Sequence, residues 1–218
     1  MDIAIQRKNM VESQVRPSDV TDRRIIRAML ALPREMFVSE RARDLAYMDG
    51  SVPVGTTGSG RSLLSARVFA KLVQAAQIDP DAAVLDVGAA TGYSSAVLAQ
   101  LAGSVIALEC DGALAAIAKA KLASEGQKVQ VVEGNLADGW SAEGPYDAIV
   151  VEGAVQDVPS QLLDQLKDGG RLVAIVGDGK IGRATVWRRD GSTFGQLAIF
   201  DATADLLPGF QKAHEFAF

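Results

Sequence analysis

Hydrophobic and polar positions divide the chain into an N-terminal part that favours helices and a longer part in which apolar runs alternate with helical segments. The apolar runs have the length of buried strands and lie at residues 83–87, 104–109, 128–132, 147–151 and 170–176. Helices are predicted between them, at residues 92–102, 112–125 and 158–166. Such alternation is typical of βαβ units around a parallel sheet. Two further β-rich runs, 184–189 and 195–201, predict a terminal antiparallel strand pair.

The first 80 residues follow a different pattern. Loosely amphipathic stretches predict two helices within the first 50 residues, the first ended by Pro17 and the second by Pro33. Residues 50–62 are rich in glycine and hydroxyl side chains, so no regular element is predicted there. A third helix is expected to begin at Leu63 and to end near Ile78, just before strands and helices begin to alternate.

Composition narrows the class of protein. With 218 residues, 48% of them hydrophobic and 22% charged, the chain is typical of a soluble globular domain. No apolar run approaches the ~18 residues of a membrane span, and the N-terminus is too polar for a secretory signal. The single cysteine, Cys110, excludes an internal disulfide, and the single histidine, His214, argues against a metal cluster. We therefore expect a cytoplasmic protein with no metal site and no membrane partner.

The net charge of −5 is unevenly distributed along the chain. Residues 1–70 carry 11 Lys and Arg against 8 Asp and Glu, whereas the rest of the chain carries 11 against 19. An arginine-rich segment of this kind can contact RNA or acidic substrates. Because these arginines are interspersed with acidic residues, salt-bridged helix surfaces explain them better, and a nucleic-acid partner is not expected.

A glycine-rich turn is the main candidate for a functional site. Residues 84–93 have the pattern of a buried strand that runs through Asp86 and Gly88 into a turn and then a helix. The next apolar run ends in an acidic residue, Glu109. Strand ends of this kind meet at one edge of a parallel sheet, where α/β proteins bind nucleotides and nucleosides. The alternative is an ordinary strand–turn–helix corner, in which the glycines serve geometry alone.

The spacing of the glycines indicates which ligand fits this turn. A dinucleotide fingerprint needs three glycines in the pattern G-x-G-x-x-G, but the corresponding positions here are Gly88, Ala90 and Tyr93. An NAD-dependent dehydrogenase is therefore disfavoured. The turn suits a ligand without a pyrophosphate, whose amino-acid end lies against the turn and whose ribose hydroxyls reach Glu109. S-adenosyl-L-methionine is such a ligand.

Likeness to known proteins extends over most of the chain. The stretches that carry it lie at residues 10–16, 28–29, 32–38, 46–49, 52–55, 84–93 and 165–173, with a further likeness at Asp22 and around Phe200 and Asp201. Together they resemble the protein-L-isoaspartate O-methyltransferase family. The resemblance implies an α/β fold with a seven-stranded, mostly parallel Rossmann-like methyltransferase sheet, an N-terminal helical extension and a C-terminal antiparallel strand pair. It also implies one domain over residues 1–218, with a helical cap and substrate loop at 1–80 and the core at 81–218.

The resemblance further implies a cofactor site for S-adenosyl-L-methionine. Its residues would be Asp86, Gly88, Ala89, Gly92, Tyr93 and Glu109, with Asn135 and Leu136 beside the adenine. The family usually has aspartate at the position of Asn135, whose amide oxygen can still accept a hydrogen bond from the adenine amino group. Glu152, just past the fourth predicted strand, is a further candidate for cofactor binding, and an exposed strand end is the alternative.

The predicted substrate loop departs from the family pattern. The family has Gln-Thr-Ile-Ser-x-Pro where this chain has Gly58, Ser59, Gly60, Arg61, Ser62 and Leu63. Ser59 replaces the threonine conservatively, but Arg61 stands where the family has serine. Ser62 can take over if the loop shifts by one residue, or Arg61 can clamp a carboxylate through two hydrogen bonds. The candidate catalytic residues are therefore Ser59, Arg61 and Ser62, unless the loop has lost the original substrate.

These features predict an S-adenosylmethionine-dependent O-methyltransferase that esterifies the carboxyl group of isoaspartyl and D-aspartyl residues in proteins or peptides, a protein-repair activity. A carboxylate is ionised at neutral pH, so its methylation needs in-line placement and exclusion of water rather than a general base. Two alternatives stay open. One is a methyltransferase with a changed acceptor, such as a small acid or RNA, and the other is a catalytically silent protein that binds S-adenosylmethionine.

Overall fold

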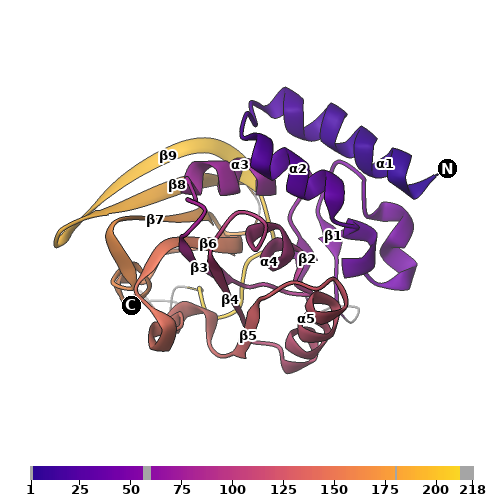
Figure 1. Ribbon diagram of the computed structural model, residues 1–218. Coiled ribbons are helices and arrows are strands. Elements are labelled where there is room, and N and C mark those ends of the chain that lie inside the picture. Colours follow the sequence, from indigo (N-terminus) through magenta and orange to yellow (C-terminus); the bar gives the residue numbers. More distant parts are fainter. Residues whose placement is uncertain (1, 56–59, 180, 212–218) are drawn as a thin grey trace, which may run out of the picture.

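The computed structural model describes residues 2–55, 60–179 and 181–211 (Figure 1). Its centre is a seven-stranded sheet with the strand order β5-β4-β3-β6-β7-β8-β9. The strands are β3 (Ala83–Val87), β4 (Ser104–Glu109), β5 (Gln130–Glu133), β6 (Tyr146–Val155), β7 (Leu166–Val176), β8 (Ile181–Asp190) and β9 (Thr193–Thr203). Neighbours from β5 to β7 run parallel, and β8 and β9 are antiparallel. The predicted fold class is confirmed.

Helices between the strands cover the sheet. They are α3 (Ala66–Ala76), α4 (Tyr93–Leu98), α5 (Gly112–Ser124) and the short α6 (Ser160–Leu163). Helix α5 begins where the Asp111 carboxylate accepts hydrogen bonds from the amides of Ala113 and Leu114, which otherwise have no partner within the helix. Helix α3 packs on β6 and β7, and α4 packs on β3 and β4.

The predicted helical extension is present at the N-terminus. It consists of α1 (Ile3–Met10), which continues as a π-helical turn (Val11–Val15) and a 3-10 turn (Arg16–Ser18), and of α2 (Arg23–Ala31). Helix α2 packs on α3 and α4, so the extension lies on the outer side of those helices in Figure 1. Successive residues of β3 divide the core, because Val84 belongs to the cluster that includes these helices and Leu85 to a second cluster.

Several predicted boundaries are wrong, among them the ends of α4 at Leu98 and of β6 at Val155. Within residues 50–62, where no regular element was expected, β1 (Val52–Pro53) pairs antiparallel with β2 (Ser62–Leu63). Strands of two residues are too short to show alternation, so the pattern alone cannot predict them. Leu63 therefore lies in a strand, and the helix begins at Ala66. The helix expected at 158–166 has only the four residues of α6, because β7 already begins at Leu166.

Candidate functional site

The turn after β3 is tied to the end of β4. The amides of Gly88 and Ala89 both donate to the carbonyl oxygen of Leu108, at 2.9 and 3.1 Å. Gly88 and Gly92 have φ values of 82° and 94°, a left-handed conformation that glycine adopts without steric cost. Ala90 also has a positive φ, 50°. The turn therefore brings its backbone close to the carboxyl end of the neighbouring strand.

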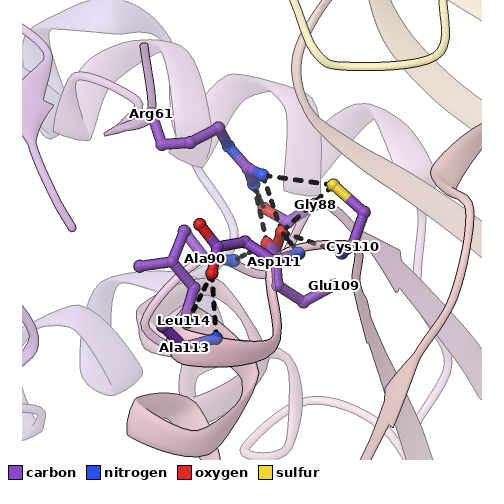
Figure 2. A network of polar contacts seen from close by, with 8 residues as sticks. All are labelled: Arg61, Gly88, Ala90, Glu109, Cys110, Asp111, Ala113 and Leu114. Atoms are coloured by element: carbon purple, nitrogen blue, oxygen red, sulfur yellow. Dashed lines mark hydrogen bonds and ion pairs between the residues drawn. The ribbon is translucent and has the colours of Figure 1, made fainter. Parts of the chain in front are cut away.

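Glu109 lies at the centre of this arrangement (Figure 2). Its side chain is fully buried. The carboxylate accepts hydrogen bonds from the amides of Ala90 at 2.7 Å, Cys110 at 2.9 Å and Asp111 at 3.1 Å. Three backbone donors from two segments thus fix the carboxylate between the turn and the start of α5.

Arg61 contacts the same carboxylate with its guanidinium group. One terminal nitrogen donates to Glu109 Oε1 and the other to Oε2, each at 2.7 Å, in the two-pronged geometry visible in Figure 2. The second nitrogen also donates to the carbonyl oxygen of Gly88 at 3.0 Å. Only 4% of the Arg61 side chain is exposed. A charged pair buried in this way persists only because both partners are paired and hydrogen-bonded.

Two further carboxyl groups, those of Asp86 and Glu152, are buried beside the turn. Asp86 Oδ2 accepts from the hydroxyls of Ser94 and Ser95, at 2.7 and 2.5 Å, whereas Oδ1 has no hydrogen-bond partner among the described residues. Burial raises the pKa of Asp86 to about 6, against the lowering effect of the two hydroxyls, and the Glu109 charge raises it further.

Glu152 lies inside β6, not past the end of a strand as predicted, because β6 continues to Val155. It is buried, so the alternative of an exposed strand end is wrong. Burial raises the pKa of Glu152 well above its usual value, the Asp86 carboxylate raises it further, and the Arg34 guanidinium lowers it. Its Oε1 has no hydrogen-bond partner within the part of the chain that the structure describes.

Arg34 was not among the sequence candidates, although it lies in one of the family-like stretches. It is fully buried, and its guanidinium donates to the carbonyl oxygens of Ala46 at 2.8 Å and Leu64 at 2.7 Å. The same group lies over the Tyr93 ring, 4.7 Å from its centre. Arg34 therefore joins the helical extension, the residues after β2 and the first residue of α4.

The segment after β9, which sequence reasoning did not connect with the site, crosses the carboxyl end of β6. The amide of Leu207 donates to the carbonyl oxygen of Ala154 at 2.9 Å. The amide of Ala154 in turn donates to the carbonyl oxygen of Asp205 at 2.8 Å. A β-carbon at Gly88 would lie 3.2 Å from a Leu207 methyl carbon, so this side chain packs directly on the turn.

The remaining candidates have other surroundings. Asn135 uses its side-chain oxygen to accept from the amide of Ala137 at 3.2 Å, and Leu136 is fully buried. Tyr93 packs against Phe37 and Phe69. Ser62 donates to Asp205 Oδ2 at 2.6 Å.

Ser59 and His214 lie outside the described residues. Among those that are described, no group of His, Cys, Asp and Glu is arranged to hold a metal ion. Nor does any helix in those ranges have the length and apolar character needed to cross a bilayer.

A small cavity lies between the turn and β2. Its volume is about 10 Å³, roughly the room that one water molecule needs. The residues that line it include Arg34, Ser62, Gly88, Tyr93 and Glu152. The structure therefore brings together most of the candidates at the carboxyl ends of β3, β4 and β6, with little free space among them.

The fold and this site define a class of protein. A mostly parallel seven-stranded sheet that carries a glycine turn after β3 and a carboxylate at the end of β4 is the architecture of S-adenosylmethionine-dependent methyltransferases. Residues 5–198 match the family model described as Protein-L-isoaspartate(D-aspartate) O-methyltransferase (PCMT). The chain belongs to that family.

Individual relatives agree with the family model. The chain is 43% identical to Protein-L-isoaspartate O-methyltransferase 1 of Rhodopseudomonas palustris (strain HaA2) over 175 residues, which are 80% of this chain and 70% of that protein. A solved protein-L-isoaspartate O-methyltransferase matches with a TM-score of 0.81 and 23% identity, over 93% of this chain and 66% of the other. A Plasmodium falciparum protein described as a PCMT, solved in complex with S-adenosyl-L-homocysteine, matches with a TM-score of 0.77 and 18% identity, over 92% of this chain and 97% of the other. At these identities the two structures support the fold alone.

Proposed function

We propose that this chain transfers the methyl group of S-adenosyl-L-methionine to the carboxyl group of isoaspartyl residues in proteins and peptides. Membership of the family is the observation that supports this proposal most strongly. The buried carboxylate of Glu109, fixed beside the glycine turn at the end of β4, is consistent with it.

The residues of the site suit this cofactor in their chemistry. The carboxylate of Glu109 is an acceptor suited to ribose hydroxyls. Asp86 and Glu152 each carry one buried carboxyl oxygen without a hydrogen-bond partner among the described residues, and such oxygens suit a positively charged ligand. We assign cofactor binding to these three residues and to the turn at Gly88, Ala89 and Gly92, with Tyr93, Asn135 and Leu136 as their neighbours.

S-adenosyl-L-methionine supplies an activated methyl group when bound. The acceptor carboxylate is ionised at neutral pH, so no residue of the chain has to remove a proton from it. The chain contributes position, because its backbone at the turn and its carboxylates are held by hydrogen bonds before the ligand arrives. It also contributes exclusion of water, because the site is lined by buried side chains.

The acceptor is proposed to lie near the start of β2. Ser62 lines the cavity beside the turn, and Arg61 is the residue before it. With Ser59, these remain the candidates for contact with the acceptor. An altered acceptor, such as a small acid or RNA, stays the alternative, because Arg61 replaces the serine that the family pattern has there.

Transfer of labelled methyl tests the proposal. The enzyme is incubated with labelled S-adenosyl-L-methionine and either a peptide that contains L-isoaspartate or its normal aspartyl twin. Label in the isoaspartyl peptide alone is the expected result, and Glu109→Gln should reduce it strongly. Equal labelling of both peptides, or labelling of neither while S-adenosylhomocysteine binds, would show that the acceptor is different.

A further inference from the structure

The place proposed for the cofactor is filled by side chains of the chain itself. We propose that Arg61 and Leu207, together called the plug, compete with the cofactor, so that S-adenosylmethionine binds only when the plug leaves Glu109 and Gly88. This inference rests on the proposed function, because it assigns Glu109 to the ribose. Arg61 would then inhibit cofactor binding by occupying Glu109, a contact that its neighbour Ser62 does not make.

Arg61 occupies the acceptor sites of the Glu109 carboxylate that ribose hydroxyls would use. Oε1 accepts from the Arg61 guanidinium and from the amides of Cys110 and Asp111, and Oε2 accepts from Arg61 and the amide of Ala90. A carboxylate offers about four lone-pair sites, and these five donors use them all. The backbone donors belong to the turn and to the start of α5, so Arg61 is the donor that can leave without unfolding the site. Ribose hydroxyls therefore need Arg61 to leave.

Leu207 closes the same place from the other side. Its side chain packs between two glycines, because a β-carbon would lie 3.2 Å from it at Gly88 and 2.6 Å from it at Gly153. Only 2% of Leu207 is exposed. Between the turn and β2 the structure leaves a cavity of about 10 Å³, which has no room for a nucleoside. S-adenosylmethionine can contact Glu109 and Gly88 only if these side chains move, because Arg61 and Leu207 cover both residues.

A hydrogen bond connects the two parts of the plug. The hydroxyl of Ser62, the residue after Arg61, donates to Asp205 Oδ2 at 2.6 Å. Asp205 belongs to the same segment as Leu207, and that segment is attached to β6 by two backbone hydrogen bonds at Ala154. Displacement of Arg61 and displacement of Leu207 are therefore coupled.

Competition between Arg61 and the cofactor predicts the direction in which the affinity for S-adenosylhomocysteine changes when Arg61 is replaced. When the binding-competent form is only a small fraction of the molecules, the apparent dissociation constant is raised by the inverse of that fraction. Arg61→Ala removes the competing guanidinium and should tighten binding of S-adenosylhomocysteine by about tenfold or more. Arg61→Lys keeps a charge but loses the two-pronged contact, so its affinity should lie between those of the wild type and Arg61→Ala.

Titration calorimetry with S-adenosylhomocysteine on the full chain tests this order. Leu207→Ala should also tighten binding, and it serves as the second variant if Arg61→Ala does not fold. Arg67→Ala is the matched control, because the Arg67 side chain is 53% exposed and its Nε lies 3.9 Å from Asp49 Oδ1, outside the site. Its affinity should equal that of the wild type.

Hydrogen exchange gives a readout that a merely structural role would not change. Saturating S-adenosylhomocysteine should accelerate exchange of the Leu207 and Ala154 amides, whose hydrogen bonds hold the segment in place, while it protects the turn.

The proposed competition would be overturned if Arg61→Ala and Leu207→Ala both bind S-adenosylhomocysteine as tightly as the wild type or more weakly. Slower hydrogen exchange of the Leu207 amide with ligand bound would overturn it too. Absence of binding by every variant would overturn it as well, together with the assignment of the cofactor site. Tighter binding without methyl transfer to the isoaspartyl peptide would instead support the plug and contradict the proposed function.

Discussion

Asp86→Asn should stabilise the free protein at high pH, against the usual effect of a buried substitution. The Asp86 carboxyl is fully buried, and its pKa is raised from 3.8 to about 6 by burial and by the Glu109 charge, against the hydroxyls of Ser94 and Ser95. A group whose pKa is raised on folding favours the folded state when protonated. That contribution is fully present below the unfolded pKa of 3.8 and is lost as the pH rises through about 6.

The pKa shift of Asp86 sets the expected change in the free energy of unfolding. One pKa unit corresponds to about 1.4 kcal/mol, so ionised Asp86 costs about 3 kcal/mol at pH 8 relative to an unperturbed carboxyl. An asparagine side chain has the same shape, accepts from the two serine hydroxyls and carries no charge. Asp86→Asn should therefore raise the free energy of unfolding at pH 8 by up to about 3 kcal/mol. The gain should shrink by about 1.4 kcal/mol at pH 5, where the wild-type carboxyl is largely protonated.

Urea denaturation of both proteins at pH 5 and pH 8 measures this difference. Asp147→Asn is the matched control, because it makes the same chemical change at a carboxylate with the opposite shift. Burial raises the pKa of Asp147, but the Lys167 ammonium and the Ala83 amide more than offset this and hold it below 3.8. The stability that ionised Asp147 contributes is lost only as the pH falls through its folded-state pKa, which lies below 3.8. Asp147→Asn should therefore lower the free energy of unfolding equally at pH 5 and pH 8. A gain for Asp86→Asn that is the same at both pH values, or a loss at pH 8, would refute the reasoning.

Two further substitutions test the site's construction. Glu109→Gln leaves the buried Arg61 without its charged partner and should cost about 3–5 kcal/mol in urea denaturation, and Arg61→Met in the same chain should recover part of that loss. No recovery would mean that the two side chains are not energetically coupled. Gly88→Ala should cost more than about 1–2 kcal/mol, because φ is 82° and the new β-carbon meets Leu207. Gly126→Ala has a similar φ but open space around it, so an equal loss there would contradict a role for the Leu207 contact.

The sheet could be predicted from the sequence because its inner strands are buried on both faces. Strands β3 and β4 are mostly apolar and almost fully buried, with Asp86 as the charged exception inside β3, and their ends at Val87 and Glu109 agree with the prediction. The end of β6 could not be predicted, because Glu152 and Gly153 interrupt the apolar run although the strand continues to Val155. Burial of that glutamate depends on its neighbours in the fold, which a local pattern does not contain.

The contacts between distant segments could not be predicted from the sequence for the same reason. Arg61 was a candidate for a substrate carboxylate, but its partner in the structure is Glu109, 48 residues away. No local spacing relates the two residues, which meet only in the fold, where Arg61 also contacts the turn at Gly88. Leu207 lies in a stretch without regular pattern, so its packing on the turn has no signal in the sequence.

The activity proposed for this chain is the methylation of isoaspartyl carboxyl groups. Its most direct measurement is kcat/KM for an L-isoaspartyl peptide and for its aspartyl twin, with the methyl ester located by tandem mass spectrometry. We expect a methyl ester on the isoaspartyl residue and no measurable ester on the aspartyl twin. No ester on either peptide, from enzyme that binds S-adenosylhomocysteine, would contradict it.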